Sequence, residues 1–107
     1  MAVSKEYKNY IEDCLSRVGD VRIRAMMGGY LVYYRGKLVG DIGDGMLLVK
    51  RTAASDRLLP DAELAYPYEE SRTLMPVIDD PEDIELLREL FEDMYAELPE
   101  RKPAKAR

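Results

Sequence analysis

Apolar and β-branched residues gather in three short runs near the middle of the chain. The runs are 31–34, 37–42 and 46–49, and glycine-containing segments, Arg35-Gly36 and Gly43-Asp44-Gly45, separate them. Runs of this composition suit a half-buried pleated surface. Glycine at the separators permits the positive φ that short hairpin loops need. The pattern therefore predicts a meander of three antiparallel strands.

Two longer segments have helical periodicity instead. Residues 4–18 carry apolar side chains at three- and four-residue spacing, which places them on one face of an amphipathic helix. Ser4 is the predicted N-cap of this helix and Gly19 its predicted C′ residue. A second helix is predicted over 81–97, with Asp80 as its N-cap and a proline in its first turn.

The segment between the meander and the last helix contains shorter elements. Residues 52–59 predict a short helix capped by Thr52, and 64–66 and 72–78 predict two strands. The second of these strands belongs at a sheet edge, because Pro76 cannot donate to a ladder. The predicted fold is α+β in the order α-βββ-α-ββ-α, a two-layer structure with an antiparallel sheet of about five strands and helices packed on it.

The apolar positions of these elements predict the core. We expect six side chains to lie buried between sheet and helices, namely Met26, Leu31, Val49, Ile84, Leu87 and Phe91. A chain of 107 residues can bury about 65% of its unfolded surface, which is enough for one core without disulfides or metal. We therefore expect one domain over residues 1–98, followed by a basic disordered tail over 99–107.

The formal charge of −5 is unevenly distributed. Residues 79–97 contain nine acidic residues against Arg88 alone, while residues 98–107 contain one acidic and four basic residues. The acidic helix repels nucleic acid, so we expect no tight DNA binding by the protein alone. No apolar run approaches the roughly 18 residues that span a bilayer, and the first residues lack the apolar region of a signal peptide. We expect a cytoplasmic protein with no membrane contact.

The residue types that usually carry catalysis are scarce. The sequence has no histidine, which removes the commonest general base and the commonest metal ligand. Cys14 is the only cysteine, and its place on the apolar face of the first helix indicates a buried structural residue. The loop 40–45 lacks the Gly-Lys-Ser/Thr of a P-loop and the final glutamate of an EF-hand. We predict no catalytic residue, no metal ligand and no cofactor.

Basic and aromatic residues are the stronger candidates for binding. Arg22 and Arg24 alternate with apolar residues on the strand that enters the meander, so both project to one side, and Lys50-Arg51 end the third run. These residues predict either a basic strip that binds an acidic partner, a phosphate or nucleic acid, or a solvated sheet edge. Five tyrosines predict either a self-association surface or packing inside the monomer, namely Tyr30, Tyr33, Tyr34, Tyr66 and Tyr68.

Two motifs stand out in the middle of the chain, Arg24-x-Met26-Met27-Gly28-Gly29-Tyr30-Leu31 and Asp44-Gly45-x-Leu47-x-Val49-Lys50. They resemble the N-terminal domain of the TfoX/Sxy competence regulators, where the family pattern is approximately Arg-x-Met-Phe-Gly-Gly-Tyr followed by Asp-Gly-x-Leu-Tyr-Leu-Lys. The resemblance extends loosely over residues 4–98. Met27 stands where the family usually has phenylalanine, the segment after Met75 is shortened, and the helical second domain of full-length regulators is not expected here.

The resemblance implies an antiparallel sheet with helices in a secretion-chaperone-like arrangement, and a non-enzymatic regulatory module. We expect contact with a protein partner in transcriptional regulation and a homodimer. The alternative is a small-molecule-binding protein or small enzyme with an Arg/Tyr-lined cleft. The candidate interaction residues are Arg22, Arg24, Met27, Gly28, Gly29, Tyr30, Lys50 and Arg51. At least one glycine of the Gly28-Gly29 pair is expected to have positive φ or a close backbone neighbour.

Overall fold

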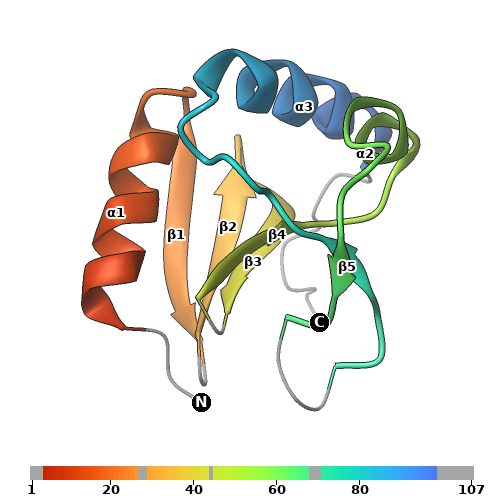
Figure 1. The fold of residues 1–107 in the computed structure, drawn as a ribbon. Helices are drawn as coiled ribbons and strands as arrows, with labels where there is room; N and C mark the ends of the chain where they lie inside the picture. The colour runs from red at the N-terminus through yellow and green to blue at the C-terminus, as the bar shows by residue number, and fades with distance from the viewer. Residues whose placement is uncertain (1–3, 27–28, 44, 68–70, 99–107) are drawn as a thin grey trace, which may run out of the picture.

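The computed structural model describes residues 4–26, 29–43, 45–67 and 71–98. Three helices and six strands follow one another along the described chain (Figure 1). They are α1 (Lys5–Ser16), β1 (Val21–Met26), β2 (Gly29–Tyr34), β3 (Lys37–Gly43), β4 (Met46–Val49), α2 (Ala53–Leu58), β5 (Leu64–Ala65), β6 (Met75–Pro76) and α3 (Ile84–Glu97). The predicted α+β fold is confirmed. The predicted basic tail lies outside the described residues.

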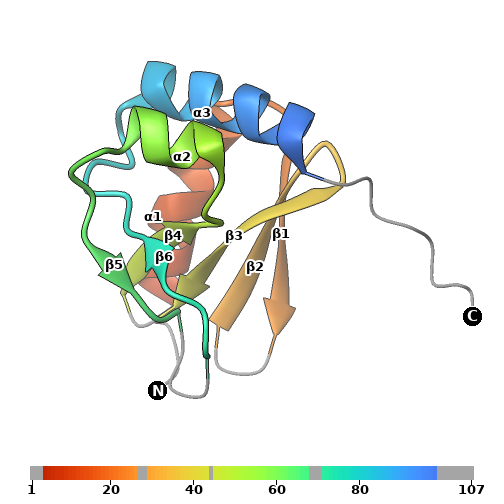
Figure 2. The ribbon, with the colours of Figure 1, turned by 90° about the vertical axis from the view of Figure 1, so that its right-hand side faces the viewer.

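The strands form two antiparallel sheets rather than one. The larger sheet has the order β1-β2-β3-β4, and β5 pairs with β6 in a separate two-stranded sheet. A single bridge between Leu48 and Val77 joins the two. The strand that enters the meander becomes a full edge strand, and Pro76 lies in the short second sheet opposite Leu64. Figure 2 shows the larger sheet with α3 above it and the small sheet at the side of β4.

Local sequence rules explain the hairpin and the close strand packing. The β2–β3 turn places Arg35 at φ 52° and Gly36 at φ 87°, as a two-residue turn with two positive φ angles requires. Gly40 has a different role, because a Cβ atom added there would lie 2.1 Å from the carbonyl oxygen of Leu48. Only glycine therefore fits at this point of the β3–β4 pair.

Helix α1 begins as predicted but ends earlier. Ser4 caps it by accepting a hydrogen bond from the backbone N–H of Tyr7 at 3.1 Å. The helix ends at Ser16 with Arg17 as C-cap, so the prediction of Gly19 as C′ residue is wrong. The side chain of Arg88 in α3 donates to the carbonyl oxygens of Arg17 and Val18, at 2.7 and 3.2 Å. The Cys14 and Leu15 carbonyl oxygens at the helix end accept from Arg17 N–H and Val18 N–H, and Arg88 satisfies the two carbonyl oxygens that follow the helix.

Helix α3 begins three residues later than predicted. Asp80 accepts a hydrogen bond from Glu82 N–H, but this bond belongs to a turn ahead of the helix. Asp83 is the N-cap: its carboxylate accepts from Leu86 N–H at 3.2 Å, and its φ of −79° and ψ of 80° are not helical. Thr52 caps α2 as predicted, with a reciprocal bond from its backbone N–H to Ser55.

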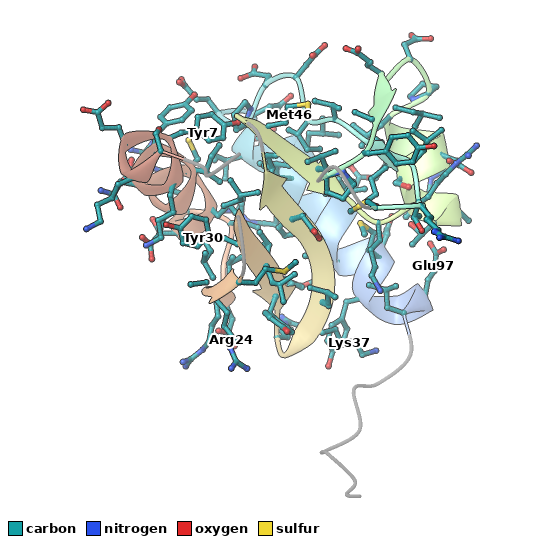
Figure 3. The ribbon with its side chains drawn as sticks, turned by 90° about the horizontal axis from the view of Figure 1, so that it is seen from below. Tyr7, Arg24, Tyr30, Lys37, Met46 and Glu97 are labelled. Atoms are coloured by element: carbon teal, nitrogen blue, oxygen red, sulfur yellow. The ribbon has the colours of Figure 1, made fainter. Side chains whose placement is uncertain are left out.

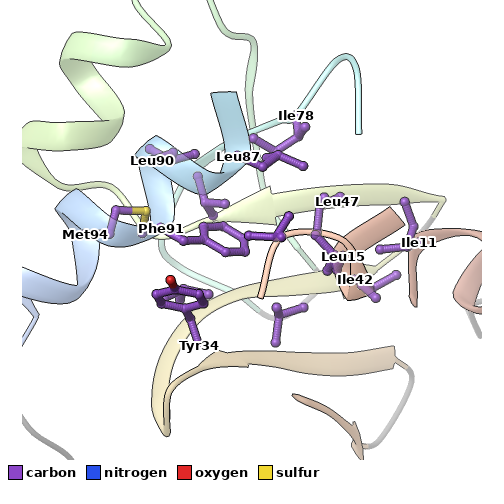
Figure 4. Packing of buried hydrophobic residues seen from close by; sticks show 14 of the residues in the cluster. Ile11, Leu15, Tyr34, Ile42, Leu47, Ile78, Leu87, Leu90, Phe91 and Met94 are labelled. Carbon is purple, nitrogen blue, oxygen red and sulfur yellow. The ribbon is translucent and has the colours of Figure 1, made fainter. Parts of the chain in front are cut away.

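The core lies between α1, α3 and one face of the larger sheet. Phe91 is fully buried, and the centre of its ring lies 5.5 Å from the centre of the Tyr34 ring. Figure 4 shows the two rings within the cluster. The prediction of burial is confirmed for Val49, Leu87 and Phe91. Other fully buried side chains of the cluster are Ile11, Leu15, Val32, Val39, Leu47, Leu90 and Met94. Cys14 is buried at 4% exposure, as predicted.

Three of the six predicted core residues are only half-buried. Ile84 packs at the margin of the core cluster. Met26 and Leu31 are not between sheet and helices, because Leu31 stands opposite Arg24 and Asp41 in the register and shares their face of the sheet. Both line a groove on that face. The apolar residues of β2 are nearly continuous, so the sequence pattern could not decide which alternate set faces the core.

Truncation of Phe91 tests the placement of α3. We expect Phe91→Ala to lower the free energy of unfolding by about 3–5 kcal/mol, because the substitution loses transfer free energy and leaves a cavity. Glu89→Ala on the exposed side of the same helix is the control and should change stability by less than about 0.5 kcal/mol. Urea unfolding monitored by circular dichroism measures both. Equal effects of the two substitutions would contradict this packing.

Candidate functional site

The larger sheet has a second face that α1 and α3 do not cover. The register places six residues on this outer face, namely Arg22 and Arg24 of β1, Leu31 and Tyr33 of β2, and Leu38 and Asp41 of β3. Figure 2 looks onto this side, and no described helix lies over β1, β2 or β3 there. The outer face is therefore the part of the sheet that a partner can reach.

The predicted basic residues border the outer face on opposite sides. Arg22 and Arg24 lie on β1, and Lys50 and Arg51 directly follow β4. Because β2 and β3 lie between these edges, the two pairs are separated by three strand spacings, about 14 Å. The structure does not bring the four residues into one strip. The pair on β1 stands by itself as a candidate site.

The rest of the predicted interaction set divides between two locations. Tyr30 faces the core side, where Lys8 Nζ lies 5.7 Å from the centre of its ring, and Figure 3 shows it pointing toward α1 while Arg24 points away from the helices. Gly29 opens β2 opposite Met26. Met27 and Gly28 lie outside the described residues, and so does the predicted backbone geometry of that glycine pair.

Most basic residues of the described chain already have polar partners. Five of them form ion pairs with carboxylates, namely Lys8, Arg17, Arg35, Arg51 and Arg57. Two others, Lys37 and Arg88, donate to backbone carbonyl oxygens. The side chains of Arg22 and Arg24 are exposed and form no hydrogen bond or ion pair. Two neighbouring guanidinium groups on one strand thus remain available for an acidic partner.

A groove of about 700 Å³ runs along β1, here called the edge groove. Four consecutive residues of the strand line it, Val21–Arg24, so the groove follows the strand edge itself. Glu12 and Ser16 of α1 form the facing wall, and Tyr33 contributes from β2. The edge groove combines an extended backbone, two arginines and a nearby acidic wall.

A second groove, of about 410 Å³, lies on the β3–β4 side of the outer face. Its apolar lining comes from Met26, Leu31, Leu38 and Met75, and Asp41 is the carboxylate among them. Burial raises the pKa of Asp41, and the nearby positive charge of Lys50 partly offsets that rise. Sequence analysis missed Asp41 as a notable residue, although aspartate inside a strand pattern is an unusual choice.

The described chain offers little for other chemistry. Within these residues, no group of three or more histidine, cysteine, aspartate or glutamate side chains is arranged to hold a metal ion. Burial raises the pKa of the Cys14 thiol, and a thiol that stays protonated is a poor nucleophile. None of the helices in the described ranges is long and apolar enough to cross a membrane.

The comparisons with known proteins give one relative. The chain is 29% identical over 107 residues to a protein of Spirochaeta aurantia described as an uncharacterized 12.7 kDa protein in the trpE 5′ region. The match covers 100% of this chain and 93% of that protein. No family model matches the chain, and no solved structure matches it. The similarity therefore extends over the whole domain.

Substitution of Asp41 tests the electrostatic cost of this carboxylate. A folded-state pKa above the ordinary value of 3.8 means that stability falls as pH rises from below 3.8 through the raised pKa. We expect Asp41→Asn to be more stable than the wild type at pH 7, and the difference to shrink at pH 3. Urea unfolding at both pH values measures this, with exposed Asp61→Asn as control. A pH-independent difference, or a less stable Asp41→Asn protein at pH 7, would contradict it.

Proposed function

We propose that this protein is a cytoplasmic, non-enzymatic interaction module similar to the N-terminal domain of the TfoX/Sxy regulators, which binds an acidic protein partner in transcriptional regulation. One observation carries the protein-binding part: Arg22 and Arg24 project from an edge strand without polar partners. Arginine is enriched in protein interfaces, where its planar donors pair with carboxylates. The transcriptional role depends on the sequence resemblance alone.

Charge distribution supports a protein partner over DNA. Helix α3 contains five acidic residues and one basic residue, Arg88, whose side chain already donates to the Arg17 and Val18 carbonyl oxygens that follow α1. Two free arginines on β1 can neutralise only a few phosphates, and binding of that kind weakens steeply with salt. The proposal is therefore that the protein alone does not bind duplex DNA tightly at physiological salt.

The alternative function is binding of a small molecule in an Arg/Tyr-lined cleft. The edge groove favours it in one respect, because Arg22, Arg24 and Tyr33 all contribute to its lining. Its volume of about 700 Å³ falls within the range typical of ligand pockets. A metabolite that copurifies with the wild-type protein, and is lost on substitution of the arginines, would support this alternative.

Charge reversal tests the proposed partner surface. We expect Arg22→Glu/Arg24→Glu to lose proteins of the native cell extract that the immobilised wild type retains, because the carboxylates would repel an acidic surface. Lys5→Glu/Arg72→Glu is the matched control, since these exposed cations also lack ion pairs but neither lies on β1 or lines the edge groove. Quantitative mass spectrometry compares the three samples. Identical retention by all three proteins would contradict the proposed surface.

We also propose that the chain forms a homodimer through an apolar patch on the small sheet, here called the hairpin patch. It consists of Leu64, Tyr66 and Leu74, which are 39%, 50% and 39% exposed. In the β5–β6 pair, Ala65 lies opposite Met75, and Tyr66 and Leu74 are the residues next to that pair. By contrast, Tyr34 is 3% exposed and packs in the core, and Tyr33 on the outer face is only 7% exposed, so neither presents an exposed ring for self-association.

Light scattering tests the homodimer. We expect a solution mass of twice 12.3 kDa for the wild type and a monomer mass for Leu64→Lys/Leu74→Lys, because ammonium groups would replace the apolar contact. Tyr10→Lys is the control, since Tyr10 is 41% exposed and belongs to α1, which Figure 1 shows on the opposite side of the molecule from β5. A monomeric wild type, or a dimer that survives the double substitution, would contradict the proposal.

A further inference from the structure

One edge of the larger sheet is open, and it is the β1 edge. β1 pairs with β2 alone. Beyond that ladder, the described part of the chain gives β1 one backbone hydrogen bond, from Val21 N–H to the Gly19 carbonyl oxygen at 2.9 Å. Alternate residues of an antiparallel edge strand direct both backbone groups outward, so about three residues of β1 can accept another strand.

The surroundings of this edge have room for an extended chain. The edge groove follows Val21–Arg24 residue by residue, and Glu12 and Ser16 of α1 stand on its other side. In Figure 1, α1 runs beside β1 over the length of the strand. A segment lying in the edge groove would therefore meet the backbone of β1 and the polar side of α1 together.

The charges of the edge select what can lie there. Arg22 and Arg24 are two residues apart on one side of β1, a spacing of about 6.8 Å. A strand added to β1 in register presents its own alternate residues on that same side at the same spacing. Carboxylates at two such positions would each face a guanidinium group, and opposite charges directly across a strand pair are favourable.

A second copy of the chain is a poor occupant of this edge. Pairing of β1 with β1 of another copy about a two-fold axis keeps each residue on its side of the sheet. Registers centred near Ile23 then place Arg22 opposite Arg24, or each arginine opposite itself. Like charges directly opposite are destabilising, so the two arginines disfavour self-pairing.

We propose that β1 binds an extended acidic segment of a partner protein as an added fifth strand, with acidic residues at alternate positions facing Arg22 and Arg24. This inference rests on the proposed protein-binding function and states the mode of binding. Residues between the acids turn toward the wall that contains Glu12, so they are not acidic. The segment therefore has the pattern acid-x-acid, and consecutive acids fit less well. Backbone hydrogen bonds give affinity in this mode and alternate side chains give specificity.

Synthetic peptides test the charge pattern with the full chain. The probe is an eight-residue peptide alternating glutamate with threonine, blocked at both ends. One control has the same composition with its four glutamates consecutive, and a second replaces glutamate by lysine. We expect the alternating glutamate peptide to bind at least about tenfold more tightly than either control, with NMR shifts concentrated in Val21–Met26. Equal binding of the alternating and consecutive peptides would overturn the proposal.

Charge exchange in the protein and N-methylation of the peptide backbone test whether the segment binds as an added strand. Arg22→Glu/Arg24→Glu should reverse the preference and bind the alternating lysine peptide, whereas Lys5→Glu/Arg72→Glu should keep the wild-type preference. N-methylation of alternate peptide residues removes the donors of one edge, so one methylated set should lose binding about tenfold and the other set should not. This comparison uses the wild-type protein and does not depend on the folding of any variant. Loss by neither set would overturn strand addition.

The results of these experiments distinguish the added strand from the proposed binding of an acidic partner protein. If methylation has no effect while Arg22→Glu/Arg24→Glu still loses its cellular partner, the added strand is overturned and the acidic-partner surface stands. If Arg22→Glu/Arg24→Glu retains every cellular partner, and the wild type binds the alternating glutamate peptide no more tightly than the control peptides, the added strand and the acidic-partner surface are both overturned.

Discussion

Helix α3 is tied to the rest of the chain through backbone groups at helix ends, and the arrangement of the molecule depends on these ties. Arg88 donates to the last carbonyl oxygens around α1, and Lys37 of β3 donates to the Tyr95 and Leu98 carbonyl oxygens at 2.8 Å each. Glu97 accepts from Ala53 and Ala54 N–H at the start of α2, at 2.9 Å each. The first N–H groups of α2 and the last carbonyl oxygens of α3 lack partners within their own helices, so these bonds satisfy them and hold α3 against α2, β3 and the segment that follows α1.

The same ties decide which face of the sheet is left for binding. With α3 fixed over it, the face that carries Tyr34 becomes core, and the Tyr34 hydroxyl donates to Glu92 of α3. The alternate residues of β1 and β2 must then point outward, which exposes Arg22 and Arg24 and leaves Leu31 half-buried. The candidate site is therefore a consequence of the register that the core imposes.

Local sequence signals predicted the elements well, because hairpins and caps depend on a few neighbouring residues. The Arg35-Gly36 turn, the Ser4 cap and the Thr52 cap all needed no tertiary information. The start of α3 was missed because Asp80 and Asp83 can both cap, and only the backbone angles distinguish them. For the site, alternation placed Arg22 and Arg24 on one side, but strand order was needed to separate them from Lys50 and Arg51.

The described chain covers the β4 edge of the larger sheet with its own backbone and leaves the β1 edge open. On the β4 side, Ile78 N–H donates to the Leu47 carbonyl oxygen at 2.8 Å and Val77 bridges Leu48, so the chain covers that edge with its own backbone. On the β1 side, the described chain supplies no such cover, only two arginines that oppose pairing with a second copy. Because its two arginines disfavour pairing with a second copy of the chain, the β1 edge stays available to a strand of the opposite charge.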